Sequence, residues 1–474
     1  MVFLRHAEPR FREGLRQHGM LEGTGYRLHN TGSIKHRFGD QWAGSSLLAE
    51  ARESGQLYYF DRICGGMPYQ SLDGLAQIAT SLKNDPNFLG FQVHEWGNSP
   101  IHDYERVHEL ILSNDEPFDA AHFARFEGRI DRPFFSAGDF NTYRDIFREL
   151  ESLDDVERYL EQYFQKYVTL ASGQILSVTG FGQLHHAALR LGAKNVMPEI
   201  GNQVPLTALQ IAFARGAARE YGKPFGAYYE PWGGSPMGGY CALSFSPWAP
   251  GTPDLTQLSG FNLGPKFGSS RSLQRRLLYF SWLSGAAFFA EEWGAECCFS
   301  NWDDYPLTEY GAIVKEFVTV NRRFPRPTPI TPAALVMPPD AFGIDIRYVA
   351  GATDNVWRLA PPDLFHIRLR SFARSFYAPQ PRIPGEDSRN LTPSPWIGCF
   401  DVLSADAPDA LLKRYPLLIY FDQKQAAESG LTKDRGLVFE DTPAVEAECI
   451  SRLQTRLPFL VTGRVGCIQS RGDE

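Results

Sequence analysis

Apolar and polar residues alternate along most of the chain in a pattern that separates short strands from longer helices. From Leu57 onward, each short apolar segment is followed by a loop with glycine or proline and then by a stretch with helical periodicity. The clearest helix is predicted between Leu206 and Tyr221, where apolar residues follow one stripe and Gly222-Lys223-Pro224 supplies a stop signal. The pattern predicts strands that end within residues 58–63, 88–94, 134–137, 174–179, 195–198, 225–229 and 286–290, and these ranges are taken as the strands themselves.

Short strands that alternate with helices predict parallel βαβ units and an α/β fold. Seven or eight such units over about 270 residues favour a closed (β/α)₈ TIM barrel over an open sheet, and we assign this barrel to residues 57–324. Residues 1–56 have weak periodicity and are expected to form a partly irregular N-terminal segment. A proline-rich linker then leads to residues 325–474, where strand-like segments at 333–337 and 417–421 predict a smaller α/β domain.

Composition narrows the possible partners and compartments. Hydrophobic residues make up 43% of the chain and charged residues 22%, which is typical of a globular protein. The net charge of −8 argues against a nucleic acid or an anionic membrane as partner, and no apolar run approaches the ~18 residues of a spanning helix. The seven cysteines are an odd number without disulfide or zinc spacing, so we expect a reduced, cytoplasmic protein without a metal site.

Four glutamates follow predicted strands, at the end of a barrel where active sites are built. They are Glu95, Glu199, Glu230 and Glu292, and three of them precede a tryptophan by one or two positions, namely Trp96, Trp232 and Trp293. Glycoside hydrolysis needs two carboxyl groups that flank the scissile bond, and aromatic rings pack on the faces of sugars. The pattern therefore favours a hydrolase that acts on a carbohydrate substrate without a cofactor, although an aromatic content of 13% by itself indicates only a large core.

The glutamates differ in their surroundings. Glu292 ends the most apolar strand, where an unpaired charge is costly, while Glu291 before it should point to the other face by strand alternation. Glu95 and Glu199 are both candidates for the second catalytic carboxyl, and Glu230 could equally pair with an arginine. Further candidates for substrate binding are His94, Asn98, Asn202, Gln203, Trp232, Trp293, Trp302 and Trp96. A histidine at a position like that of His94 is more often a hydrogen-bonded core residue than a substrate ligand.

Two segments resemble a known family. The run from Ser284 to Trp293, followed by Pro306 to Gly311 and a long helix, resembles the end of the barrel in retaining glycoside hydrolases of the β-galactosidase-like superfamily. The stretches 326–337 and 412–419 are similar to the flavodoxin-like domain after the barrel of bacterial trimeric β-galactosidases. The resemblance implies Glu292 as nucleophile, Glu95 as acid/base and a homo-oligomer. The family's Asn-Glu pair is absent, because His94 precedes Glu95, so Glu199 stays a rival acid and galactoside specificity does not transfer.

Two other classes of function stay open from the sequence. A barrel that binds carbohydrate without catalysis would keep the tryptophans but would need no paired carboxyl groups. A metal-dependent isomerase or lyase on the same barrel would use the carboxylates as ligands.

Overall fold

The computed structural model describes most of the predicted elements. The predicted strand 134–137 and the site candidates Asn98, Asn202, Gln203, Trp232 and Trp293 lie outside the described residues. The described residues are 1–3, 9–29, 37–64, 71–96, 145–180, 182–201, 206–230, 271–292, 294, 298–339, 341, 364–377, 394–429, 435–440 and 442–456, without the side chains of Pro9, Cys64, Leu153 and Glu230.

Eight parallel strands form a barrel, as predicted, in the order β1-β8-β7-β6-β5-β4-β3-β2. Val2 in β1 pairs with Phe289 in β8 and also bridges Thr24, just before β2, so the two ends of the sheet meet. The strands are β1 (Val2–Phe3), β2 (Tyr26–His29), β3 (Tyr58–Cys64), β4 (Phe88–His94), β5 (Ile175–Thr179), β6 (Asn195–Gly201), β7 (Gly226–Glu230) and β8 (Phe288–Glu291).

The predicted start of the barrel at residue 57 is wrong. Two of its strands, β1 and β2, lie within residues 1–56, which we expected to be irregular and outside the barrel. The reason is physical: β1 has two residues, and β2 reads Tyr-Arg-Leu-His, so neither makes an apolar run. The inward positions of β2 carry polar rather than apolar side chains, and the pattern expected of a buried strand is lost.

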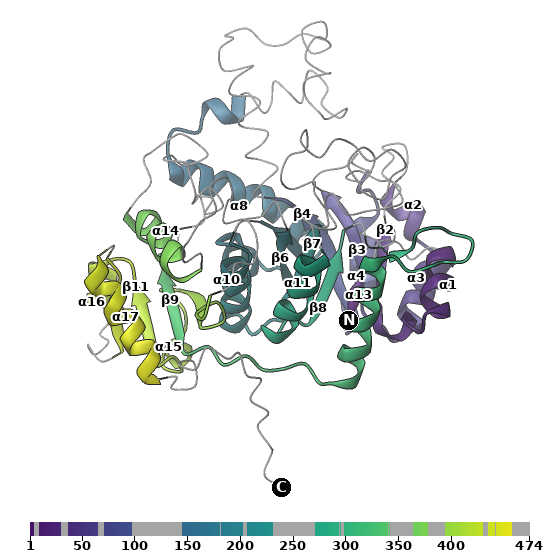
Figure 1. Ribbon diagram of the computed structural model, residues 1–474. Coiled ribbons are helices and arrows are strands. Elements are labelled where there is room, and N and C mark those ends of the chain that lie inside the picture. The colour runs from purple at the N-terminus through teal and green to yellow at the C-terminus, as the bar shows by residue number, and fades with distance from the viewer. Residues whose placement is uncertain are drawn as a thin grey trace, which may run out of the picture.

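Helices surround the barrel strands (Figure 1). The predicted helix at 206–221 appears as α10, which ends before Gly222 with φ of 62°. Helix α8 begins at a capping box in which Ser152 and Asp155 satisfy each other's backbone N–H groups. The helices of this part are α1 (Pro9–Gln17), η1 (Leu21–Gly23), α2 (Phe38–Trp42), α3 (Ser46–Glu53), α4 (Leu75–Leu82), α8 (Leu153–Leu170), α9 (Leu184–Arg190), α10 (Thr207–Glu220), α11 (Arg271–Leu283) and α13 (Glu309–Arg323).

The interior of the barrel changes from apolar to polar along the strands. Successive side chains of a strand point alternately to the helices and to the barrel axis. An apolar cluster separate from the core under the helices is formed by Phe3, Tyr59, Leu89, Leu176, Val178, Met197, Tyr228, Phe288 and Ala290. Closer to the carboxyl ends of the strands, the buried inward residues are polar: Arg27, Asp61, Gln92, His94 and Glu199. This polar layer is the basis of the candidate site.

A second, smaller parallel sheet confirms the predicted α/β part after the barrel. Its order is β10-β9-β11-β12, and Figure 1 shows it on the left with α14 to α17. The strands predicted at 333–337 and 417–421 are β9 and β11, whereas β10 and β12 were not predicted. The elements are β9 (Ala333–Met337), α14 (Leu364–Phe376), β10 (Phe400–Ser404), α15 (Asp409–Leu412), β11 (Leu417–Tyr420), α16 (Gln423–Glu428), β12 (Gly436–Val438) and α17 (Pro443–Arg456).

Helix α10 joins the barrel to the small sheet. Arg215 of α10 donates to buried Asp401 of β10 at 2.5 Å, and Tyr415 donates to the same carboxylate at 2.6 Å. Arg219 also pairs with Asp401. Gly216 lies between these arginines, and a Cβ there would sit 1.7 Å from the carbonyl oxygen of Val402. The helix can therefore approach the edge strand closely only because residue 216 is glycine.

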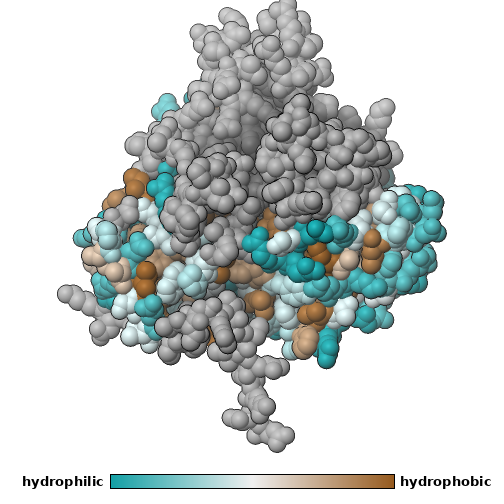
Figure 2. Space-filling view, in the orientation of Figure 1, coloured by the Kyte–Doolittle hydropathy of each residue, from teal (hydrophilic) through white to brown (hydrophobic). Residues whose placement is uncertain are grey.

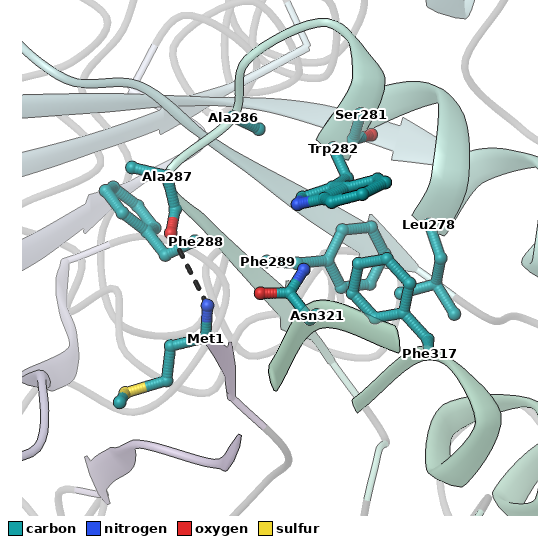
Figure 3. Close-up of a pocket in the computed structure, with 10 residues that line it drawn as sticks. All are labelled: Met1, Leu278, Ser281, Trp282, Ala286, Ala287, Phe288, Phe289, Phe317 and Asn321. Atoms are coloured by element: carbon teal, nitrogen blue, oxygen red, sulfur yellow. Dashed lines mark hydrogen bonds between the residues drawn. The ribbon is translucent and has the colours of Figure 1, made fainter. Parts of the chain in front are cut away.

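The pocket in Figure 3 lies between α11, β8 and α13, at the start of β8 rather than at its carboxyl end. Trp282, Phe289 and Phe317 line it, and the amino group of Met1 donates to the carbonyl oxygen of Ala287 at 3.5 Å. Its volume of about 10 Å³ holds roughly one water molecule, so it is too small for a sugar.

The described surface in Figure 2 is mostly hydrophilic, with scattered hydrophobic residues. Within the described ranges, no helix is long and apolar enough to cross a membrane.

Replacing Asp401 with asparagine should destabilise the protein by about 3–5 kcal/mol, because Arg215 would be left buried without its counter-ion. Urea unfolding measures the effect. The control is Asp409→Asn, which removes an exposed i,i+4 pair with Lys413 and should change stability by less than about 0.5 kcal/mol. Equal effects of the two substitutions would contradict a buried ionic link between α10 and β10.

Candidate active site

The candidate active site is the polar layer at the carboxyl ends of the barrel strands. It is formed by residues from β2, β3, β4, β6, β7 and the residue after β8. The sites of TIM-barrel enzymes lie at this end of the barrel. Of the predicted catalytic residues, Glu292, Glu95 and Glu199 all belong to this layer.

Glu292 follows β8 directly and is 7% exposed. Its carboxylate forms an ion pair with Arg62, and the same guanidinium donates to the hydroxyl oxygen of Tyr228 at 3.3 Å. Glu95 also acts electrostatically on Arg62. The guanidinium of Arg62 therefore interacts with both glutamates that the sequence analysis proposed as the catalytic pair, Glu292 and Glu95.

An irregularity in β3 directs Arg62 into this layer. By strand alternation Asp61 points to the barrel axis and Arg62 should point to the helices. The register with β4 shifts between Phe60 and Cys64, and Arg62 has φ of 41°, which is uncommon for a residue with a side chain. This bulge lets two adjacent charged residues reach the same interior.

Arg27 of β2 is fully buried and holds four strands together. It donates to the carbonyl oxygens of Glu291 and Glu292 at 3.1 and 3.0 Å. It also donates to Asp61 at 2.9 Å and to the hydroxyl of Tyr228 at 3.0 Å. Burial alone would raise the pKa of Asp61, but Arg27 and His29 hold that pKa well below its usual value, so Asp61 is charged.

His94, Glu95 and Glu199 form a second group across the barrel. Nε2 of His94 lies 3.5 Å from Glu199 and 4.0 Å from Glu95, and Nδ1 lies 2.9 Å from Nε2 of Gln92. Burial, assisted by Arg62, lowers the pKa of His94 well below its usual value, so the imidazole is neutral. Each of the three residues offers one ligand atom, and these atoms lie within 4.8 Å of one another, which is the arrangement that could hold a metal ion.

Glu95 is the most accessible carboxyl of the group, with its side chain 27% exposed against 2% for Glu199. It follows β4 with φ of 48°, and its backbone N–H still donates to the carbonyl oxygen of Val178 at 2.9 Å. Such a backbone conformation is strained for a residue with a Cβ and is found disproportionately at functional sites.

Two predicted sugar platforms do not fit the structure. Trp96 is fully buried, donates to the hydroxyl of Ser177 at 2.9 Å and packs on Phe164 of α8, so it is a core residue between the strands and the helices. Trp302 packs against Phe11 of α1 and against Phe299. It therefore lies beside α1 and not among the glutamates. Glu230 ends β7, but its side chain lies outside the described residues.

Glu291 points away from the site, as the alternation of β8 predicted. Its carboxyl accepts from Gln274 of α11 at 2.9 Å, in the layer between strands and helices. Burial raises the pKa of Glu291 to about 8, so this carboxyl is mostly protonated at neutral pH. Two consecutive glutamates thus have opposite directions and different chemistry.

Sequence reasoning missed Arg27, His29, Asp61, Arg62 and Tyr228. A signal was present, because Asp61-Arg62 interrupts an otherwise apolar strand and Arg27 and His29 occupy alternate positions of β2. Charged residues inside a buried strand need partners, so their presence indicates a polar cluster. The sequence alone does not identify the strands that supply the partners of these charged residues.

No family model matches the chain, and no curated protein matches it. Solved structures that are similar at low identity include a β-galactosidase, a GH5_18 protein and an α-L-fucosidase. The β-galactosidase from Rahnella sp. R3 is 12% identical with a TM-score of 0.43, and the match covers 89% of this chain and 67% of that one. A GH5_18 protein from Bifidobacterium longum subsp. infantis is 12% identical with a TM-score of 0.38, covering 94% and 99%.

The third structure is the α-L-fucosidase isoenzyme 2 from Paenibacillus thiaminolyticus. It is 11% identical with a TM-score of 0.34, and the match covers 88% of this chain and 59% of that one. These scores describe a distant likeness, so the function of this chain has to be argued from its own residues.

Replacing Glu95 with glycine should give a protein more stable than Glu95→Gln by about 1 kcal/mol, because glycine adopts φ of 48° without strain. The matched control is Ser172→Gly, which relieves a similar φ of 51° between α8 and β5. Glu95→Gly should have a higher midpoint of urea unfolding than Glu95→Gln, and Ser172→Gly should have a higher midpoint than the wild type. If only Ser172→Gly does so, the backbone at residue 95 is not strained.

Replacing Glu291 with glutamine should stabilise the protein increasingly as the pH rises. The pKa of Glu291 is about 8 in the folded state and near 4.5 in the unfolded state, so the folded protein binds more protons between these values. The wild type therefore loses stability from pH 5 to pH 8, on the order of 4 kcal/mol, and the glutamine variant does not. Urea unfolding at pH 5 and pH 9 tests this, and a constant difference between the two proteins would refute it.

Proposed function

We propose that this protein is a glycoside hydrolase that cleaves an O-glycosidic bond with Glu292 and Glu95. The observation that carries the proposal is the position of Arg62, which pairs with Glu292 while Glu95 acts on it electrostatically. Two carboxyl groups at the carboxyl end of a barrel are the minimum that glycoside hydrolysis needs.

Glu292 suits the role of nucleophile in a retaining mechanism. Its side chain is fixed by Arg62, and its backbone carbonyl is fixed by Arg27. A nucleophile must be held close to the anomeric carbon, and a carboxylate without rotational freedom loses less entropy on attack. The resemblance of the segment around Glu292 to retaining enzymes supports the same role.

Glu95 suits the role of acid/base better than its rival Glu199. The group that protonates the leaving oxygen must later activate a water molecule, so it has to reach solvent. Glu95 has its side chain 27% exposed, whereas that of Glu199 is 2% exposed and lies against His94. Glu199 is better placed to orient Glu95 and His94 than to exchange protons with water.

The steps are then as follows. Glu95 gives its proton to the glycosidic oxygen as the bond from this oxygen to the anomeric carbon breaks, and the bonding electron pair stays on the oxygen. A carboxylate oxygen of Glu292 bonds to the anomeric carbon and forms a glycosyl-enzyme intermediate. Glu95, now ionised, takes a proton from water, whose oxygen attacks the anomeric carbon and releases Glu292.

We propose that the small sheet is a flavodoxin-like domain and that the protein is a cytoplasmic homo-oligomer. Numbered along the chain, its strands lie in the order 2-1-3-4, as in the first four strands of flavodoxin. Three cysteines whose side chains are described, Cys298, Cys399 and Cys449, are free and buried, in keeping with a reducing compartment. The similarity of the tail to trimeric enzymes supports the oligomer, and light scattering of the purified protein measures it.

Kinetics on aryl glycosides that differ in their leaving group should separate the two roles. Glu95→Gln should lower kcat/KM for phenyl glycosides by about 10²–10⁴-fold and hardly change it for 2,4-dinitrophenyl glycosides, which leave without protonation. Glu292→Gln should lower both by at least about 10⁴-fold. Added azide should restore turnover of both glycine variants. With Glu95→Gly the product should be a glycosyl azide of the substrate's own anomeric configuration, and with Glu292→Gly a glycosyl azide of the opposite configuration.

The matched control is Glu291→Gln, one residue before Glu292 but facing α11, which should keep wild-type kinetics. Glu199→Gln and Glu230→Gln test the rival assignments: a dependence on leaving group in Glu199→Gln would move the acid role to Glu199. Full turnover by Glu292→Gln would reject the nucleophile.

A metal-dependent isomerase or lyase is the second candidate function, favoured by the spacing of ligand atoms in His94, Glu95 and Glu199. Loss of activity with EDTA and recovery with a divalent ion would support it. Binding of sugars without turnover of any aryl glycoside would instead support a carbohydrate-binding barrel.

A further inference from the structure

Three side chains with metal-binding atoms meet at the carboxyl ends of β4 and β6. His94 ends β4, Glu95 follows it and Glu199 lies in β6, and one donor atom of each lies within 4.8 Å of the others. We propose that these residues bind a divalent transition-metal ion such as Zn²⁺, and that the bound ion prevents Glu95 from acting as a proton donor. The metal site stands independently of the proposed hydrolysis, whereas its inhibitory effect rests on that function.

The distances between the donor atoms suit a small four-coordinate ion. Zinc binds imidazole nitrogen and carboxylate oxygen at about 2.0–2.2 Å, so the ligand atoms of a tetrahedral site lie roughly 3.3–3.6 Å apart. Nε2 of His94 lies 3.5 Å from Oε1 of Glu199 and 4.0 Å from Oε1 of Glu95. The side chain of Glu95 is 27% exposed, so it can move to close the longer distance. Three protein ligands leave the fourth position to water.

The backbone of β4 brings two of the ligands together. Successive residues of a regular strand point to opposite faces, so His94 and Glu95 would not share a ligand. The φ of 48° at Glu95 breaks this alternation. It directs a second carboxyl group toward the imidazole that already lies beside Glu199. Because the ligands come from two strands far apart in the chain, no local spacing in the sequence indicates the site.

Gln92 gives an independent indication of a metal on His94. It is fully buried, two residues before His94 on the inner face of β4, and its Nε2 lies 2.9 Å from Nδ1 of His94. A histidine that binds a metal through Nε2 carries its hydrogen on Nδ1 and donates it to a neighbouring oxygen. Among the described residues, none donates to Oε1 of Gln92. The amide can therefore turn over and present this oxygen to Nδ1–H without losing another bond at Oε1.

The charges around His94 also favour a cation. Two carboxyl groups this close repel each other when both are ionised, and a divalent ion between them replaces the repulsion with attraction. Each carboxyl group has a second oxygen that can keep its other contacts. Arg62 acts on Glu95, but its own charge is offset by the ion pair with Glu292. The imidazole ligand selects against Mg²⁺ and Ca²⁺, which prefer oxygen ligands.

Metal binding and the acid role of Glu95 exclude each other. A carboxyl group must lose its proton before it binds a metal, and a metal-bound Glu95 has no proton for the glycosidic oxygen. Zn²⁺ should therefore inhibit hydrolysis reversibly, and EDTA should restore the activity.

Calorimetric titration of the EDTA-treated full chain with zinc chloride measures binding without turnover. We expect one site, whose affinity falls more than about 100-fold in Glu199→Gln, because loss of a direct ligand exceeds the 10- to 100-fold cost of losing an outer partner. Gln92→Leu should weaken binding by about 10- to 100-fold, and Gln92→Glu, which accepts from Nδ1–H, should keep the affinity. The matched control is Glu291→Gln, a buried glutamate that faces α11 and should bind zinc as the wild type does.

X-ray absorption of the wild-type zinc complex identifies the ligands and needs no variant. The proposed site gives nitrogen and oxygen at about 2.0–2.2 Å with the scattering of one imidazole, whereas a cysteine site gives sulfur at about 2.3 Å. The imidazole signal should be lost in His94→Asn. A sulfur shell, the absence of binding, or an affinity unchanged by Glu199→Gln would each overturn the metal site.

Kinetics on aryl glycosides separate the metal site from the proposed function. Zinc bound by nitrogen and oxygen in a protein that hydrolyses no glycoside would support the metal site and reject the hydrolase. Hydrolysis at the full rate with the site saturated by Zn²⁺ would overturn the inhibition and remove Glu95 from the ligands. Hydrolysis in a protein that binds no zinc would reject the metal site and leave the hydrolase intact.

Discussion

The buried guanidinium of Arg27 is the interaction on which the architecture of the site depends. A charge inside a barrel is tolerated only when its hydrogen bonds and its counter-ion are supplied by the surrounding strands. Here β3 supplies Asp61, β7 supplies Tyr228, and the end of β8 supplies two backbone carbonyl groups. The same contacts that neutralise Arg27 therefore fix the relative positions of the strands that carry Glu292, Arg62 and His29.

The polar layer also depends on two departures from regular strand geometry. A regular strand sends alternate residues inward, so it cannot place adjacent charged residues in one cluster. Positive φ at Arg62 and Glu95 breaks this alternation at the ends of β3 and β4. Strain of this kind persists only where surrounding contacts hold it, and the ion pair with Glu292 and the backbone bond from Glu95 to Val178 do so here.

Sequence patterns predicted the apolar part of this protein better than its polar part. Strands β3 to β8 were foreseen because each presents an apolar run, and the opposite directions of Glu291 and Glu292 followed from alternation alone. Strands β1 and β2 were missed because one is very short and the other carries Arg27 and His29. Trp96 was misread as a sugar platform because its neighbour Glu95 has positive φ, which shifts the expected faces by one residue.

The pair Glu291 and Glu292 shows why the site could be located but not fully described from the sequence. Both are buried glutamates at the end of one strand, and what separates them is their partners: an amide of α11 for Glu291 and a guanidinium of β3 for Glu292. Burial raises the pKa of Glu291 to about 8, whereas Glu292 forms an ion pair with Arg62. The partner of Glu292 comes from a residue 230 positions away. Composition and periodicity carry local information, whereas the chemistry of a barrel site is set by contacts between distant strands, so only the fold decides which glutamate is available for catalysis.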